Sequence, residues 1–186
     1  MKINEFKKTL FVNLYGGPCA GKSTIAAHVF AELKWNKFSS EIITEYAKQL
    51  VWEESFPKMR NQLYILGKQH NKQFTLNGKV DVAVTDSPFI LSLIYDDGRT
   101  SFLREMAMGE FNKLWNMNIF LERAHEYDPT GRTQKTKEEA VVKDNEIKQF
   151  LFDNGIEYIT MKSNKEAVEV ITDMIKKELE QNGDNN

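Results

Sequence analysis

A glycine-rich stretch near the N-terminus has the spacing of a phosphate-binding loop. Gly16-Gly17-Pro18-Cys19-Ala20-Gly21-Lys22-Ser23 fits the pattern G-x-x-x-x-G-K-[ST], between a β-prone run and an amphipathic segment. Glycine permits backbone conformations in which successive N–H groups point at phosphate oxygens, and the following helix adds its positive dipole. We therefore predict that residues 16–24 bind the phosphates of ATP.

Individual side chains of this loop have separate expected roles. Lys22 can bridge the β- and γ-phosphates, and the Ser23 hydroxyl can ligate Mg²⁺. Thr24 supplies the next hydroxyl, nearer an α-phosphate. Cys19 is interpreted as a small side chain that fits the loop, although a thiol beside a helix N-terminus could also be redox-sensitive.

Two carboxylates follow predicted strands. Asp86 ends the run Val82-Ala83-Val84-Thr85, and Glu45 ends Ile42-Ile43-Thr44. Ligands of open parallel sheets bind beyond the carboxyl ends of the strands. Asp86 is thus a candidate Mg²⁺ ligand with Ser23, and either carboxylate could bind an acceptor or take its proton.

Arginines and amides complete the candidate site. Phosphoryl transfer requires charge neutralisation and exclusion of water, so Arg123 and Arg132 are predicted to act from a helical lid over residues 123–136. Gln62 and Gln69 lie near one face of the helix expected over 59–76, where an amide could bind a nucleobase or carboxamide edge.

Apolar runs alternate with amphipathic segments along the chain. This alternation predicts right-handed crossovers and an α/β, three-layer fold around a five-stranded parallel sheet. The expected strands cover residues 10–15, 41–44, 80–85, 117–121 and 156–160. The expected helices cover residues 23–35, 45–54, 59–76, 89–95, 101–115, 136–152 and 164–179.

Composition limits the class of protein. The 186 residues carry a net charge of −2 and one cysteine, which favours a single cytoplasmic domain over residues 1–186 with a frayed polar tail at 180–186. No apolar run is long enough to span a membrane. The near-neutral balance disfavours DNA as a partner.

Several motifs in order resemble a known family. The loop, Ile-Thr-Glu-Tyr-Ala-Lys, Gln-Leu-Tyr-Ile-Leu-Gly-Lys-Gln, Val-Thr-Asp-Ser-Pro and Asp-Pro-Thr-Gly-Arg-Thr-Gln are similar to the P-loop kinase family that contains the ribosylnicotinamide kinase domain. Similar small kinases occur in bacteriophages. The placement of Glu45 also resembles the base of deoxynucleoside kinases, but Asp86-Ser87-Pro88 lacks the arginine those enzymes carry.

The resemblance implies a P-loop NTPase fold of the nucleoside and nucleotide kinase type, with ATP and Mg²⁺. We therefore expect a kinase that transfers the γ-phosphate of ATP to a nucleoside, nucleotide or related base-bearing acceptor. One alternative is a kinase for a modified base within DNA, with lysines beside the acceptor cleft. Another is a regulatory NTPase without such an acceptor. The oligomeric state stays open, a homodimer included.

Overall fold

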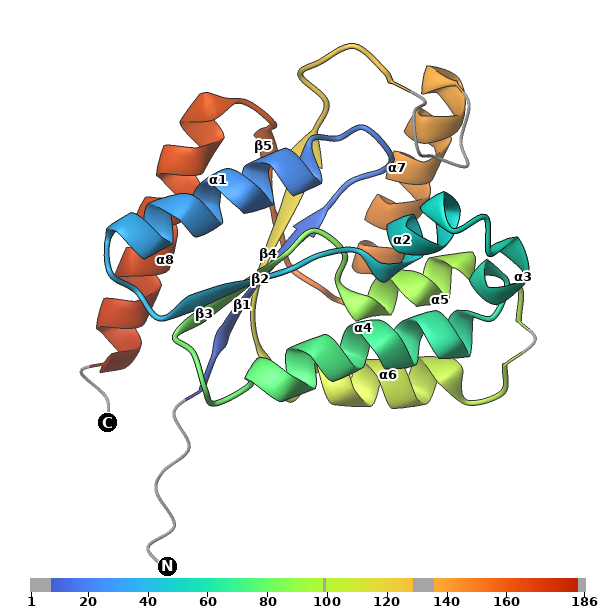
Figure 1. Cartoon of the computed structure of the whole chain (residues 1–186), viewed down its shortest axis with the longest axis horizontal. Coiled ribbons are helices and arrows are strands. Elements are labelled where there is room, and N and C mark those ends of the chain that lie inside the picture. Colours follow the sequence, from blue (N-terminus) through green and yellow to red (C-terminus); the bar gives the residue numbers. More distant parts are fainter. Residues whose placement is uncertain (1–7, 99, 129–135, 184–186) are drawn as a thin grey trace, which may run out of the picture.

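The computed structural model describes residues 8–98, 100–128 and 136–183. Its centre is a five-stranded sheet in the order β2-β3-β1-β4-β5, with every neighbouring pair parallel (Figure 1). The strands are β1 (Leu10–Tyr15), β2 (Ser40–Ile43), β3 (Val82–Thr85), β4 (Trp115–Glu122) and β5 (Ile159–Lys162). The predicted α/β fold with a five-stranded parallel sheet is confirmed.

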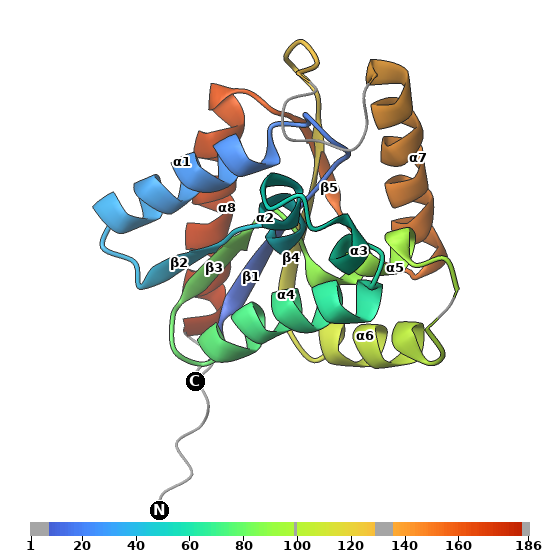
Figure 2. The same ribbon diagram turned by 45° about the vertical axis from the view of Figure 1, so that its right-hand side comes forward.

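Helices cover both faces of this sheet and form three layers (Figure 2). On one face, α1 (Lys22–Trp35) and α8 (Lys165–Gly183) share an apolar cluster with the strands. The other face packs against α4 (Gln62–Leu76), η1 (Phe89–Leu91), α6 (Leu103–Phe111) and α7 (Lys137–Asp153). The short helices α2 (Tyr46–Trp52), α3 (Phe56–Met59) and α5 (Ser92–Tyr95) complete the described elements.

Strand β1 lies in the middle of the sheet, and all six of its residues are buried. A strand covered on both faces needs side chains that tolerate burial, which explains its nearly continuous apolar run. Asn13 is the polar exception. Its Nδ2 donates to Oδ1 of Asn116 (2.9 Å) and Oδ1 of Asn118 (3.0 Å) on β4.

The helix expected over residues 59–76 is shorter than predicted. Pro57 lies in the first turn of the separate helix α3, and α4 begins only at Gln62. The side chain of Asn61 accepts a hydrogen bond from Tyr64 N (3.1 Å), which satisfies a free amide of the first turn. The cap at Asn61 therefore sets the start of α4.

Other boundaries also differ from the prediction. Helix α6 ends at Phe111 rather than 115, so β4 begins at Trp115. Strand β5 lies later than expected, over Ile159–Lys162. Residues 180–183, predicted as part of a frayed tail, instead continue helix α8.

Because the strands are parallel, the segments that follow them meet at one edge of the sheet. The glycine-rich loop follows β1, Glu45 follows β2, Asp86 follows β3 and Arg123 follows β4. The fold thus gathers the predicted site residues from distant parts of the sequence. Among the described residues, no helix is long and apolar enough to cross a membrane.

Candidate active site

The glycine-rich loop depends on two glycines with positive φ. Gly16 has φ 137°, and a Cβ there would lie 2.8 Å from Leu121 O. Gly21 has φ 79°, and its Cβ would lie 1.9 Å from Ser163 Oγ. Because glycine has no side chain, the backbone can approach these atoms closely and turn tightly between β1 and the start of α1. Cys19 also has a positive φ of 59°, and its Sγ donates to Asp128 O (3.0 Å).

The loop borders a cavity of about 170 Å³, called the loop cavity below. Its lining is polar. Lys22 extends back across the loop, where its Nζ donates to Gly16 O (2.6 Å) and Gly17 O (2.9 Å). The lining comprises Cys19, Ala20, Gly21, Lys22, Ser23, Thr24, Glu45, Lys48, Asp86, His125 and Glu126.

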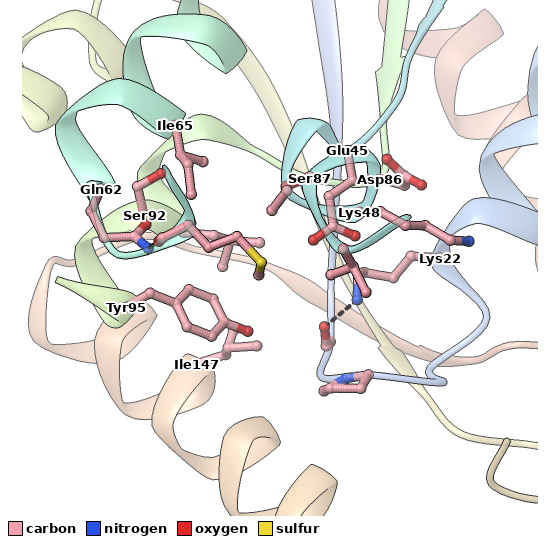
Figure 3. A pocket seen from close by; sticks show the side chains of 16 residues that line it. Lys22, Glu45, Lys48, Gln62, Ile65, Asp86, Ser87, Ser92, Tyr95 and Ile147 are labelled. Atoms are coloured by element: carbon pink, nitrogen blue, oxygen red, sulfur yellow. Dashed lines mark hydrogen bonds between the residues drawn. The ribbon is translucent and has the colours of Figure 1, made fainter. Parts of the chain in front are cut away.

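A second cavity of about 140 Å³, called the apolar cavity, adjoins the first. Apolar side chains line much of it, including Ile65, Met59 and Ile147. Figure 3 shows Gln62, Ser92 and Tyr95 at one end, and the charged groups at the other. The two cavities share the charged residues Lys22, Glu45, Lys48 and Asp86. A ligand in either cavity therefore reaches the same charged cluster.

Asp86 is the most perturbed acid of this cluster. Its side chain is 6% exposed, and its Oδ1 is buried without a hydrogen-bond partner. Burial first, and the negative charge of Glu45 second, raise the pKa of the Asp86 carboxyl to about 6 against the opposing positive charge of Lys22. An unpartnered buried carboxylate oxygen is a candidate ligand for a cation.

Ser23 and Asp86 line the same loop cavity. A hydroxyl and a carboxylate are hard oxygen donors, which is the chemistry that Mg²⁺ prefers. Mg²⁺ usually takes one or two such protein ligands together with substrate phosphates. Across residues 8–98, 100–128 and 136–183 there is no cluster of three or more acidic, histidine or cysteine side chains that could hold a metal alone. Ser23 and Asp86 thus have the chemistry of the one or two protein ligands that Mg²⁺ takes.

Glu45 is held at the start of α2 by a buried amide. Gln69 is 2% exposed, its Oε1 accepts from Tyr46 N (3.1 Å), and its Nε2 donates to Thr44 O (3.3 Å). These two bonds fix the backbone on either side of Glu45. Both ends of the Gln69 amide thus bind this backbone, and Gln69 lines neither cavity, so its contact with a substrate stays a prediction.

Gln62, unlike Gln69, lies beside a cavity, and its contact with an acceptor stays a prediction. It lines the apolar cavity, and its Nε2 donates to Met59 O (2.8 Å). Since a carbonyl can only accept, this bond fixes which way the amide is turned. Tyr95, which no motif in the sequence indicates, lies near Gln62 in the same cavity (Figure 3). Burial raises the pKa of the Tyr95 phenol above its usual range, so it is a neutral hydroxyl.

Arg123 follows β4 and lies at the base of the loop. Its Nε donates to Pro18 O (2.9 Å), its Nη2 donates to Ala140 O (3.1 Å), and its Nη1 pairs with Asp144. Arg123 lines neither cavity here. No local pattern in the sequence distinguishes Asp144 from the other acids of α7. Residues 123–128 of the predicted lid form no helix. Arg132 lies outside the described residues, so its role stays a prediction.

A comparison with known protein families assigns the chain to a family. A family model described as an AAA domain matches residues 11–182. The chain belongs to this AAA-domain family. The more specific resemblance to the ribosylnicotinamide kinase domain stays a prediction.

Among curated proteins, RecA of Staphylococcus carnosus (strain TM300) is 30% identical over 93 residues. That match covers 46% of this chain and 26% of RecA, so the chain spans about a quarter of the length of this relative.

Solved structures with kinase activity share the fold of this AAA-domain protein. The APS kinase CysC of Mycobacterium tuberculosis, in complex with AMPPNP and APS, gives a TM-score of 0.53 at 10% identity, over 91% of this chain and 98% of that one. The deoxyadenosine kinase of M. mycoides, with the products dCMP and dCDP bound, gives 0.50 at 16% identity, over 92% and 99%. The chain therefore shares its fold with P-loop kinases, and a shared fold does not by itself assign a function.

Proposed function

We propose that this protein is an ATP-dependent kinase that transfers the γ-phosphate of ATP to a hydroxyl of a nucleoside, nucleotide or related base-bearing acceptor. One observation carries the proposal: the loop cavity and the apolar cavity meet at the same charged cluster. A phosphate donor and a ring-bearing acceptor would thus face each other across Lys22, Glu45 and Asp86. Phosphoryl transfer needs this alignment more than any covalent help from the protein.

The donor side follows from the loop. The loop over residues 16–24 binds the phosphates through backbone N–H groups other than that of Gly17, which donates to Asp144, and through the N-terminus of α1. Lys22 neutralises charge on the β- and γ-phosphates. Ser23 and Asp86 are the residues that would hold Mg²⁺ beside the nucleotide. When bound, this ion neutralises the negative charge that develops on the phosphate oxygens.

The acceptor side follows from the apolar cavity. Its apolar walls suit the faces of a flat ring, and Gln62 offers its amide to the ring edge. The acceptor oxygen attacks the γ-phosphorus while the bond from that phosphorus to the β–γ bridging oxygen breaks. Glu45 accepts the hydroxyl proton, and ADP leaves with the bridging oxygen. We assign the role of proton acceptor to Glu45 because Asp86 is the proposed Mg²⁺ ligand.

Transfer of ³²P from [γ-³²P]ATP tests the proposal with nucleosides, nucleoside monophosphates and single-stranded oligonucleotides as acceptors. We expect either the nucleosides or the nucleoside monophosphates to be labelled. We expect Lys22→Ala to lower the rate of labelling about a hundredfold or more. Lys34→Ala is the matched control, because Lys34 pairs with Glu41 on the surface, at 3.5 Å. Labelling of oligonucleotides alone would favour a DNA kinase. Phosphate release that ignores every acceptor would favour a regulatory NTPase.

A further inference from the structure

Helix α7 contacts the phosphate-binding loop through one carboxylate. Asp144 Oδ1 accepts a hydrogen bond from the backbone N–H of Gly17 at 2.6 Å. Its other oxygen, Oδ2, pairs with the Arg123 guanidinium. One side chain therefore binds both the loop backbone and the arginine that follows β4. The two partners lie 127 and 21 positions away in the sequence.

Arg123 extends the same contact to the next residue of the loop. Its Nε donates to Pro18 O (2.9 Å), and its Nη2 donates back to Ala140 O (3.1 Å) on α7. The side chains of Arg123 and Asp144 are 9% and 17% exposed. Water competes weakly for a pair that is this well covered, so its hydrogen bonds are stronger than those of a surface ion pair.

Gly17 fits this arrangement because it has no side chain. A Cβ there would lie 2.7 Å from Asp144 Oδ1, 2.8 Å from Ala140 O and 2.8 Å from Arg123 Nη2. The loop backbone thus packs directly onto the ion pair and the helix. Any side chain at position 17 would push the loop and the pair apart.

We propose that Asp144 is a positioning residue for the donor site. By holding Gly17 and Arg123, it fixes the first half of the loop in the shape that receives the nucleotide phosphates. Ile147, three residues further along the same face of α7, lines the apolar cavity. One helix therefore contacts both substrate regions, through Asp144 on the donor side and Ile147 on the acceptor side. The proposal rests on the proposed function only in requiring that the loop binds a nucleoside triphosphate.

Titration calorimetry with ATP and Mg²⁺ tests this role without any acceptor. For Asp144→Ala we expect the Kd for ATP to rise about tenfold or more, because charge-assisted hydrogen bonds to the loop are lost. Asp144→Asn keeps an oxygen for Gly17 but turns an amide N–H₂ toward a donor, so an intermediate Kd is expected. Asp153→Asn, on the same helix and bonded to Gln149, is the control and should match wild type.

A second measurement needs no nucleotide. We expect hydrogen exchange of the Gly17 amide in the free protein to be faster in Asp144→Ala than in Asp153→Asn. Thermal unfolding of the free variants shows how much of any change is loss of stability. A lowered Tm with an unchanged Kd for ATP would overturn the positioning role and leave Asp144 merely structural. Wild-type protein that binds neither ATP nor GTP would overturn the proposed function and, with it, the purpose assigned to Asp144.

Discussion

The substitution Asp86→Asn should stabilise the free protein while abolishing its activity. In the folded protein the Asp86 carboxyl has a pKa of about 6, against 3.8 in an unfolded chain. The two values differ by about 2, and each pKa unit corresponds to about 1.4 kcal/mol. Ionised Asp86 therefore lowers the free energy of unfolding by about 3 kcal/mol at pH 7.5, and an uncharged asparagine removes that penalty.

The sign of the pH dependence follows from proton binding. Between about pH 4 and 6 the folded state holds a proton on Asp86 that the unfolded state has released, so the penalty grows as pH rises through this window. Urea unfolding of both proteins in EDTA, at steps from pH 4 to 8, measures the difference. We expect the Asp86→Asn variant to gain about 3 kcal/mol above pH 7 and nearly nothing near pH 4. An equal difference at every pH, or none at pH 7.5, would refute the reasoning from burial.

Two further predictions follow from the site. Gly21→Ala should lower stability by about 2–3 kcal/mol, since its φ is 79° and its Cβ would meet Ser163 Oγ at 1.9 Å. Gly67→Ala, in open space inside α4, should leave stability equal or up to about 1 kcal/mol higher, and urea unfolding compares the two. The kcat/KM for ATP should fall as pH drops through about 6, as Asp86 of the free enzyme takes up its proton. A plateau that extends down to pH 4.5 would contradict this assignment.

Local patterns in the sequence were enough to predict the sheet and the loop. The apolar run of residues 10–15 and the glycine spacing of residues 16–23 each reflect physics that acts within a few positions. Glu45 and Asp86 were found for a related reason, because parallel strands bring their carboxyl ends to one edge. Both residues do lie together in the structure, on the shared border of the two cavities.

What escaped prediction depends on contacts between distant residues. Glutamine is a residue type typical of the exposed face of a helix, yet Gln69 is buried against the backbone beside Glu45. Asp144 lies in a charged helix that offers several similar acids, and its partner Gly17 is 127 positions away. Periodicity within a helix does not identify which acid meets the loop. The start of α4 was also missed, because a side-chain cap at Asn61 decides it.

The amide contacts of Asn13 in the sheet interior have a consequence for the accuracy of the whole site. Asn116 and Asn118 are alternate residues of β4, so only one alignment of β1 against β4 gives Asn13 Nδ2 both acceptors. Sliding either strand by two residues would shift its end by about 7 Å. Those ends carry Gly16 on one side and Arg123 on the other. One buried and two half-buried asparagines thereby fix how far apart Gly16 and Arg123 lie at the ends of their strands.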